Sequence, residues 1–341
     1  MNSFQSAVIG CGRIGCSFDD NPHTKTRTHA GSYYKNPKTE LVALCDIDEN
    51  KLKKYGRKYG VKGLYKNSTS MFKNENIDCV SICTLVDSHL DLVKEAAIYG
   101  VKGIFVEKPI SNSLRNVQEI IKICKKNKIK LAVDHFRRFD PFYQSIKDFI
   151  KNEKLGDVQH VNVYYGSGIV NTGSHVFDLL SMFFGEVVYL KGNFSENLSP
   201  HKNDPNIDVF LKFKNGIKCV IQALNLRNYG MCEFDIFGNK GRIRLDLLSD
   251  KVAYFKKSNK NFQDYRKLMR TNMPEKRSSK SGTALGIQNL VDCMWSGMNP
   301  LCTGEDGYKS LELIIGSIQS SIKKRKIILP LDNNSYKIKS K

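Results

Sequence analysis

Residues 10–15 read GCGRIG and have the spacing GxGxxG, directly after the apolar run Ala7–Ile9. Glycines at these positions permit a tight turn and let the backbone approach a pyrophosphate, whose charge the N-terminus of a following helix can bind. The chemistry that this motif indicates is the binding of a dinucleotide. The candidate contacts are Gly10, Gly12, Arg13, Ile14 and Gly15.

A carboxylate follows at the end of the next apolar run. Asp46 ends the segment LVALCD, where its side chain can accept hydrogen bonds from the adenosine ribose hydroxyls and would repel a 2′-phosphate. This favours NAD over NADP as the cofactor. The gap from Gly15 to Asp46 exceeds the usual spacing of about 20 residues, which we attribute to an insertion around Ser17–Thr28. The alternative is that Asp46 only caps the next helix.

A lysine stands at the end of a third apolar run, in the sequence Val106-Glu107-Lys108-Pro109. An ammonium group in a closed, partly apolar site can donate a hydrogen bond to a reacting oxygen and stabilise a developing alkoxide. Pro109 restricts the turn that presents the lysine, and Glu107 could orient Lys108 or help to close a nicotinamide pocket. A lysine on a loop is more often a surface residue, but the position at a strand end favours a chemical role.

The length of 341 residues favours two domains of roughly 100 to 200 residues each. No apolar run approaches the roughly 18 residues that a membrane span needs, and glycines interrupt the apolar N-terminal stretch. The ten cysteines are scattered without paired spacing, which is typical of reduced thiols in the cytoplasm. Cys79 and Cys83 could form a metal pair, but no second Cys/His pair follows, so we expect a buried strand and no metal site.

The formal net charge of +20 is compatible with nucleic acid, an anionic ligand or an acidic membrane as partner. The lysines are spread along the whole chain, without an RNA-binding motif or a basic helix that carries aromatics, so we expect neither nucleic acid nor a membrane. The segment between Asp250 and Ser281 is denser, with ten basic residues against three acidic ones. It has little periodicity, and it could be a mobile flap over an anionic ligand or only a basic surface loop.

The first part of the chain alternates apolar strands with amphipathic helices, which is typical of a parallel sheet covered on both faces. We expect a doubly wound Rossmann domain over residues 1–136. Its strands are predicted near residues 6–9, 40–45, 78–84, 103–106 and 130–134.

Residues 137–341 are predicted to form an α+β domain around a largely antiparallel, open sheet. After an aromatic helix near residues 141–151, apolar residues alternate with polar ones, as in Ile207, Val209, Leu211 and Phe213. Asn215-Gly216 predicts a tight hairpin turn, and helices are expected near residues 284–296 and 308–323 and could pack back on the first domain. An exposed sheet face would make a homo-oligomer plausible, either a dimer or a tetramer.

Four features together resemble the Gfo/Idh/MocA oxidoreductase family over nearly the whole chain. They are the strand followed by GxGxxG, Thr84 with His89 five residues later, the tripeptide at residues 107–109, and the sequence RRFDP at residues 137–141. The resemblance implies an N-terminal Rossmann domain and a C-terminal open sheet. It also implies oxidation or reduction of one carbon of a sugar, cyclitol or sugar nucleotide.

By the same resemblance, Lys108 lies beside the substrate and the nicotinamide. His175 matches the family's second catalytic motif, and a group whose pKa is normally about 6.5 suits proton exchange with a substrate hydroxyl; the alternative is a packing role. Asn171 stands where the family has an aspartate. An amide can hydrogen-bond a substrate hydroxyl but cannot carry charge, and Asp178 could bind the substrate or orient His175.

Four more residues follow predicted strands of the first domain. Thr84 and His89 are expected to border the cofactor, although His89 could serve mainly to pack or cap rather than in catalysis, and Leu85 replaces a proline that is frequent in the family. Asp134 and Arg137 are predicted to reach the substrate. Arg138 is expected to tie the two domains together.

We therefore predict a cytoplasmic, NAD-dependent dehydrogenase that acts on the CH–OH group of a carbohydrate. The rival interpretation is a regulatory or sugar-sensing protein that binds NAD and does no catalysis. Asn171 leaves room for this rival, whereas the presence of both Lys108 and His175 argues against it.

Overall fold

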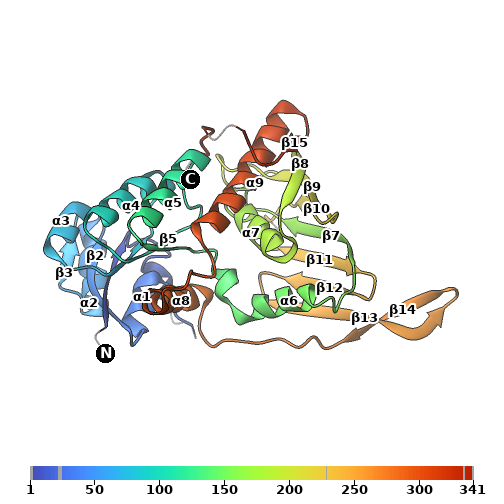
Figure 1. Cartoon of the computed structure of the whole chain (residues 1–341), viewed down its shortest axis with the longest axis horizontal. Coiled ribbons are helices and arrows are strands. Elements are labelled where there is room, and N and C mark those ends of the chain that lie inside the picture. Colours follow the sequence, from blue (N-terminus) through green and yellow to red (C-terminus); the bar gives the residue numbers. More distant parts are fainter. Residues whose placement is uncertain (1–2, 22–24, 228, 333–334, 340–341) are drawn as a thin grey trace. The chain divides into compact units, whose positions relative to one another are not determined.

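The computed structural model describes residues 3–21, 25–227, 229–332 and 335–339, which form two compact units. The first unit comprises Met1–Asp140 and Ser278–Tyr308, and the second comprises Pro141–Arg277 and Lys309–Lys339. Each unit is built around its own sheet (Figure 1).

The first unit contains a six-stranded parallel sheet in the order β3-β2-β1-β4-β5-β6. This is the Rossmann order, so the predicted domain type is confirmed. The strand order reverses between β1 and β4, and ligands of such sheets bind beside the carboxyl ends of the strands at that point. The strands are β1 (Phe4–Ile9), β2 (Thr39–Cys45), β3 (Gly63–Tyr65), β4 (Cys79–Ile82), β5 (Gly103–Val106) and β6 (Lys130–Val133).

Helices cover both faces of this sheet, with α4 and α5 on one face and α1 and α8 on the other (Figure 1). Helix α5 shows why these segments are helical: the Ser113 side chain caps its first turn, and Leu114, Val117 and Ile120 form one buried stripe. The helices are α1 (His29–Lys35), α2 (Glu49–Tyr59), α3 (Ser68–Asn74), α4 (His89–Ile98), α5 (Leu114–Lys126) and α8 (Gly282–Ser296), with short 3₁₀ turns η1 (Ser17–Asp19), η2 (Val86–Ser88) and η3 (Phe136–Phe139).

The helix after the glycine motif is interrupted and then resumed. A first turn begins at Gly12, because the Cys16 amide donates to the Gly12 carbonyl. After the excursion, the His29 and Ala30 amides donate to the carbonyls of Ile14 and Gly15, as residues 18 and 19 would in an uninterrupted helix. The insertion inferred from the sequence therefore leaves and rejoins the same helix, and α1 continues the turn that the glycine motif starts.

The second unit contains a nine-stranded sheet in the order β14-β13-β12-β11-β7-β10-β9-β8-β15. The prediction of a largely antiparallel sheet is confirmed, with β7 and β10 as a parallel pair within it. The strands are β7 (Val158–Tyr165), β8 (Val187–Phe194), β9 (Ile207–Phe213), β10 (Lys218–Ala223), β11 (Glu233–Gly238), β12 (Gly241–Asp246), β13 (Lys251–Phe262), β14 (Tyr265–Thr271) and β15 (Ile327–Ile328).

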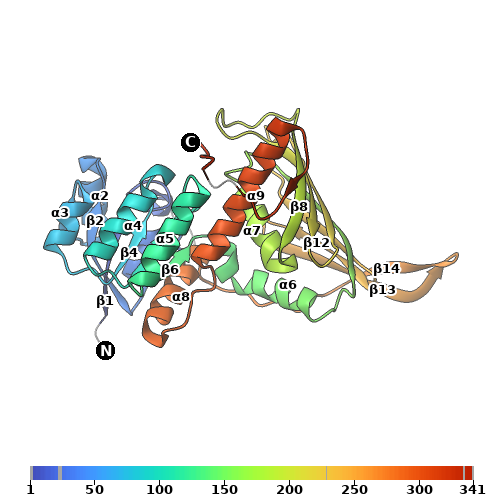
Figure 2. The same cartoon turned by 45° about the horizontal axis from the view of Figure 1, so that its top comes forward.

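Helices α6 (Pro141–Lys151) and α7 (Gly173–Phe184) belong with this sheet, seen beside it in Figure 2. Helix α9 (Gly304–Lys323) begins in the first unit and belongs to the second from Lys309 onward. Helix α7 packs on one face, where Phe184 contacts Phe213 of β9. Alternate residues of β9 are buried, as the apolar pattern predicts. The predicted turn is also present, because Gly216 has a φ of +93° between β9 and β10, a conformation that favours glycine.

The basic segment 250–281 is more regular than the sequence predicts. Most of it forms the hairpin of β13 and β14, which extends from the end of the sheet (Figure 1), rather than an irregular flap or loop. All seven residues of β14 are exposed. Because neither face of this strand is buried, no alternation of apolar and polar residues marks it in the sequence.

The ten cysteines are all free thiols, and all except Cys83 are buried. Among the described residues, no helix combines the length and the apolar character needed to cross a bilayer.

Candidate active site

The glycine motif lies at the carboxyl end of β1, and its three glycines have different roles. Gly10 has a φ of +98°, and a Cβ there would lie 2.7 Å from the Cys83 carbonyl oxygen. A Cβ on Gly15 would overlap the Gly10 carbonyl oxygen, so both positions require glycine for the fold. A Cβ on Gly12 would meet nothing within 4 Å. Gly12 therefore borders open space at the start of a helical turn, which fits a pyrophosphate.

Asp46 follows β2 and lies next to this motif. One carboxylate oxygen accepts the Cys11 amide at 2.6 Å, and the other accepts the Asp48 amide at 2.9 Å. Asp48, not Asp46, caps helix α2, so the capping alternative does not explain Asp46. Each oxygen keeps a further lone pair for a ribose hydroxyl. The half-buried carboxylate thus fits the role of ribose acceptor.

Replacing Asp46 is expected to relax the choice of cofactor. Asp46→Ala removes two ribose acceptors and the charge that repels a 2′-phosphate, so we expect NADH binding to weaken by about tenfold or more, at roughly 1.5 kcal/mol for a lost hydrogen bond to a charged group. NADPH binding should weaken less or improve. Fluorescence titration with both cofactors measures this, and Asp48→Asn serves as the control. Equal losses for NADH and NADPH would contradict a ribose contact.

Glu107, Lys108 and Pro109 follow β5, and the structure places their backbone at the strand end that the sequence predicts. One Glu107 oxygen accepts the Lys108 amide at 3.1 Å, and the Lys108–Pro109 bond is cis. Burial raises the pKa of Glu107, while a hydrogen bond from His29 and the charge of Lys108 oppose that rise. The hydrogen bond to the Lys108 amide favours the orienting role of Glu107 over closure of a nicotinamide pocket, and Lys108 is half-buried.

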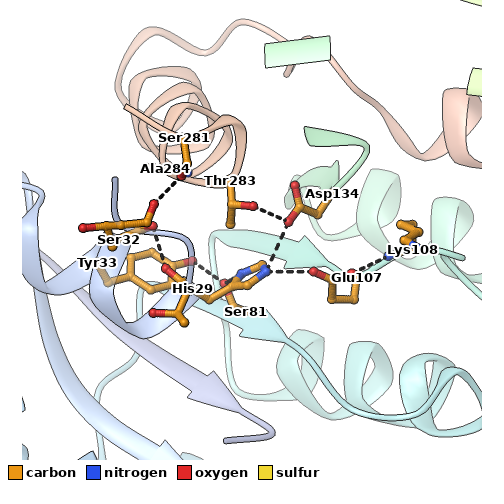
Figure 3. Close-up of polar contacts among 12 residues, drawn as sticks. His29, Ser32, Tyr33, Ser81, Glu107, Lys108, Asp134, Ser281, Thr283 and Ala284 are labelled. Carbon is orange, nitrogen blue, oxygen red and sulfur yellow. Dashed lines mark hydrogen bonds and ion pairs between the residues drawn. The ribbon is translucent and has the colours of Figure 1, made fainter. Parts of the chain in front are cut away.

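A buried polar network surrounds Glu107 (Figure 3). His29 places its Nε2 atom 3.0 Å from Glu107 Oε1 and 3.3 Å from Asp134 Oδ2, and its Nδ1 atom 2.8 Å from the Ser81 hydroxyl. Thr283 of α8 donates to the same Asp134 oxygen. The sequence predicts that Asp134 reaches the substrate, but the residue is 2% exposed, which favours a role inside the unit.

Sequence reasoning missed His29, Ser81 and Thr283. The one available signal was the position of His29, at the first residue after the insertion, where the interrupted helix resumes.

Thr84 and His89 lie beside the carboxyl end of β4. Thr84 shares a hydrogen bond with Ser88, and the His89 ring nitrogens lie 3.2 Å from the carbonyl oxygens of Thr84 and Ile110. Burial lowers the pKa of His89, against the opposing effect of these carbonyls. His89 therefore ties this loop to the turn after Pro109, which favours the packing role over direct contact with a cofactor.

The two arginines of η3 differ in environment. Arg137 is half-buried and its guanidinium lies over the Phe136 ring. Arg138 is 7% exposed and pairs with Asp306 at 3.0 Å. Asp306 belongs to the same unit as Arg138, because the chain returns to the first unit after residue 277, so this ion pair does not test the prediction that Arg138 ties the two domains together.

The second motif surrounds the start of α7. Asp204 is buried and accepts the amides of Val170 and Asn171 at 2.7 and 2.8 Å. His175 lies half-buried in the first turn of the helix, and Asp178, three residues on and 1% exposed, shares its side of the helix. Burial of Asp178 favours an orienting role over substrate binding. Asp204 was missed because it comes from the loop between β8 and β9.

Asp204 is expected to stabilise the loop before α7, because it accepts the amides of Val170 and Asn171. Asp204→Ala would leave two buried amides without their acceptor, at a cost of about 1–3 kcal/mol each when fully buried. We expect the free energy of unfolding to fall by about 2 kcal/mol or more in urea titrations. Asp208→Ala, which removes a single amide acceptor on β9, should cost less. An unchanged stability of Asp204→Ala would show that the carboxylate does not hold the loop.

A Rossmann sheet with a glycine motif after β1, a half-buried carboxylate after β2 and a lysine after β5 is typical of a dinucleotide-binding domain. The chain belongs to the Gfo/Idh/MocA oxidoreductase family. Residues 4–135 match the family's NAD-binding Rossmann fold, and residues 164–329 match its C-terminal alpha/beta domain. The resemblance inferred from the sequence is therefore confirmed, and NAD is the cofactor that the first match implies.

Relatives cover nearly the whole chain at low identity. The D-apiose dehydrogenase of Paraburkholderia graminis is 24% identical over 96% of this chain and 90% of its own length. The myo-inositol 2-dehydrogenase of Thermotoga maritima is 25% identical over 94% of this chain and 97% of its own. The WlbA dehydrogenase of Bordetella pertussis, solved with NADH and UDP-GlcNAcA, has a TM-score of 0.78 at 20% identity and covers 97% of this chain and 100% of its own.

Proposed function

We propose that this chain is an NAD(H)-dependent dehydrogenase that interconverts a secondary alcohol and a ketone at one carbon of a sugar, cyclitol or sugar nucleotide. The observation that carries the proposal is Lys108 at the carboxyl end of β5, held by Glu107 in a domain matched as NAD-binding. The relatives named as dehydrogenases of apiose and of inositol support a carbohydrate as substrate.

The glycine motif and Asp46 would hold the cofactor. The first amides of the turn that starts at Gly12 have no acceptor within that turn and suit the pyrophosphate, with Arg13 and Ile14 on the same turn. Asp46 would accept the ribose hydroxyls, and Thr84 would border the cofactor at the end of β4. When bound, NAD supplies the nicotinamide carbon that accepts or returns the hydride.

Lys108 and His175 would act on the substrate oxygen. In the oxidation, Lys108 donates a hydrogen bond to the reacting oxygen and stabilises the charge that develops there as the C–H bond breaks. His175 accepts the hydroxyl proton at a ring nitrogen and returns it in the reverse reaction. Asn171 would donate or accept a hydrogen bond from a neighbouring hydroxyl and would not carry the proton, because an amide does not ionise. Arg137 would contact the substrate.

The proposal includes a homo-oligomer in the cytoplasm. The face of the second sheet opposite α7 carries half-buried aromatics, among them Tyr164, Tyr189 and Phe210, of which the last two stack at 6.1 Å. Such a face is suited to a second copy of the chain. The ten unpaired thiols fit a reducing compartment.

A substrate panel tests the proposed function. Purified protein with NAD is incubated with cyclitols, free sugars and sugar nucleotides, and reduction of the nicotinamide is followed by absorbance. We expect turnover with at least one class. Tight binding of NAD without turnover across the panel would instead favour a regulatory protein that senses a ligand.

A further inference from the structure

His29 is a buried titratable group that the proposed chemistry does not use. Its side chain is 0% exposed and its ring lies 5.2 Å from the Phe105 ring. Its polar neighbours include Ser81 of β4, Cys83 directly after β4, Glu107 after β5 and Asp134 after β6, all in the first unit; three of them are drawn in Figure 3. Such a group requires a defined charge and a partner for each nitrogen, because burial of an unpaired polar atom is costly.

The hydrogen-bond directions determine which ring nitrogens carry protons. The Ser81 hydroxyl donates its single proton to the Tyr33 oxygen at 3.1 Å, so His29 Nδ1 must donate to Ser81. The Nε2 atom then faces carboxyl oxygens of Glu107 and Asp134, at 3.0 and 3.3 Å, which accept and do not donate when both groups are ionised. With both groups ionised, only a proton or a metal cation on Nε2 makes this arrangement attractive.

The charge balance distinguishes these two occupants. The nitrogen of His29 and one oxygen each from Glu107 and Asp134 lie within 4.8 Å of one another, close enough to hold a metal ion. Two carboxylates are balanced by one imidazolium and the Lys108 ammonium, whereas a divalent cation with neutral histidine would leave a net positive charge. Thr283 also occupies the Asp134 oxygen that would be the ligand. A proton therefore fits better than a metal.

The groups around His29 raise its pKa and so favour the protonated ring. Burial alone would lower the pKa of His29, but the charge that Cys83 carries as a thiolate and the hydrogen bonds of Asp134 and Glu107 raise it well above the usual value. Because burial also raises the pKa of Cys83, the two carboxylates carry this effect when the thiol is uncharged. The other titratable neighbours are Tyr33 on α1 and Lys108 after β5, while α8 contributes the uncharged Thr283. Because the folded pKa is raised, the stabilisation is complete below about pH 6.5 and is lost as the pH rises through the folded value.

We propose that His29 is a positioning residue whose imidazolium clamps Glu107 and Asp134 together and thereby sets the place of Lys108. The link is short: one Glu107 oxygen contacts His29, and the other accepts the Lys108 amide. Neutralising His29 would release Glu107 and let the turn that carries Lys108 move. The proposal rests on the proposed function only through the role of Lys108.

The charge of His29 can be measured without substrate. In protein labelled with ¹⁵N at histidine, the His29 signals are those absent from His29→Asn, and their shifts distinguish an imidazolium from a neutral ring. We expect an imidazolium at pH 7, where an ordinary histidine with a pKa of about 6.5 is mostly neutral. A neutral ring at pH 7, or signals that change when Zn²⁺ or Mn²⁺ is added or when a chelator removes bound metal, would overturn the proposal.

The coupling to Lys108 is tested with Asp134→Asn and with Thr283→Val as the matched control. Asp134→Asn removes one carboxylate, so the pKa of His29 should fall by at least about one unit, whereas Thr283→Val keeps the charge. In protein labelled with ¹⁵N at lysine, the Lys108 amide signal is the one absent from Lys108→Arg. In Asp134→Asn, the chemical shift of this amide should change over the same pH range as that of the His29 ring. It should not change over that range in Thr283→Val. A Lys108 amide that ignores His29 deprotonation would overturn the clamp.

The pH profile of turnover separates this inference from the proposed function. With a substrate from the panel, kcat of Asp134→Asn should fall as the pH rises through the lowered His29 value, with the KM for NAD unchanged, while Thr283→Val keeps the wild-type profile. A wild type without turnover would refute the proposed function, and the NMR titrations would still decide the clamp. If the pH profile of kcat for Asp134→Asn keeps the wild-type shape while His29 loses its proton, the clamp is refuted and the proposed function is not.

Discussion

Lys108→Met is expected to lower kcat by about 10²–10³-fold, the usual cost of removing one donor that stabilises a developing oxyanion. Methionine keeps the length of the side chain without its charge. Because the proposed contacts of the cofactor lie on the glycine motif and Asp46, the Kd for NADH should stay within about twofold. Steady-state kinetics with a substrate from the panel, together with fluorescence titration of NADH, measures both quantities.

Lys102→Met is the control for this prediction. Lys102 precedes the same strand at its amino end, where it is mostly exposed and pairs with Asp78. Its loss should leave kcat unchanged, because surface ion pairs contribute little. A Lys108→Met enzyme with wild-type kcat would remove Lys108 from the reaction, and a large loss of NADH binding would assign it to cofactor binding instead.

Gly12→Ala is expected to lose affinity for NADH, whereas Gly15→Ala is expected to lose stability. A methyl group on Gly12 meets no protein atom, so the variant should unfold at the same urea concentration as the wild type, but the methyl group would obstruct a pyrophosphate. We expect its affinity for NADH to fall by at least about tenfold, or about 1.4 kcal/mol. Gly15→Ala places the methyl group on the Gly10 carbonyl oxygen and should lose about 3 kcal/mol of stability.

Urea unfolding and NADH titration of both variants check this pair. A destabilised Gly12→Ala would mean that the space beside Gly12 is needed by the fold, and unchanged binding of NADH would place the pyrophosphate elsewhere. A Gly15→Ala protein as stable as the wild type would contradict the close approach of the Gly15 backbone to the Gly10 carbonyl.

The architecture of the first unit could be predicted from local patterns of apolar and polar residues in the sequence. Buried parallel strands such as β4 and β5 are almost continuously apolar, and helices such as α5 carry a clear stripe of buried residues. The glycine motif, Asp46 and Lys108 could be found because each directly follows such a strand. The insertion could be inferred because the spacing between Gly15 and Asp46 is too long for one helix and its loops.

The missed features depend on partners that are distant in sequence. His29 and Glu107 are 78 residues apart, and Asp204 lies 33 residues from the amide of Asn171. The position of His29 directly after the insertion is the only local signal for it, and nothing in the local sequence distinguishes Asp204 from a surface residue. The burial of Asp134 depends likewise on Thr283, which α8 brings back to the first sheet from 149 residues further along the chain. The hairpin of β13 and β14 was missed for another reason, since both faces of β14 are exposed.

Direct transfer of deuterium tests the proposed function most closely. The substrate from the panel is labelled with deuterium at the carbon that carries the reacting hydroxyl, and the NADH formed is examined by NMR. A dehydrogenase of this kind should place the deuterium on one face of the nicotinamide C4 position, and Lys108→Met should do so about 10²–10³-fold more slowly than the wild type. NADH without deuterium, or NAD that is bound and never reduced, would contradict hydride transfer from the substrate carbon.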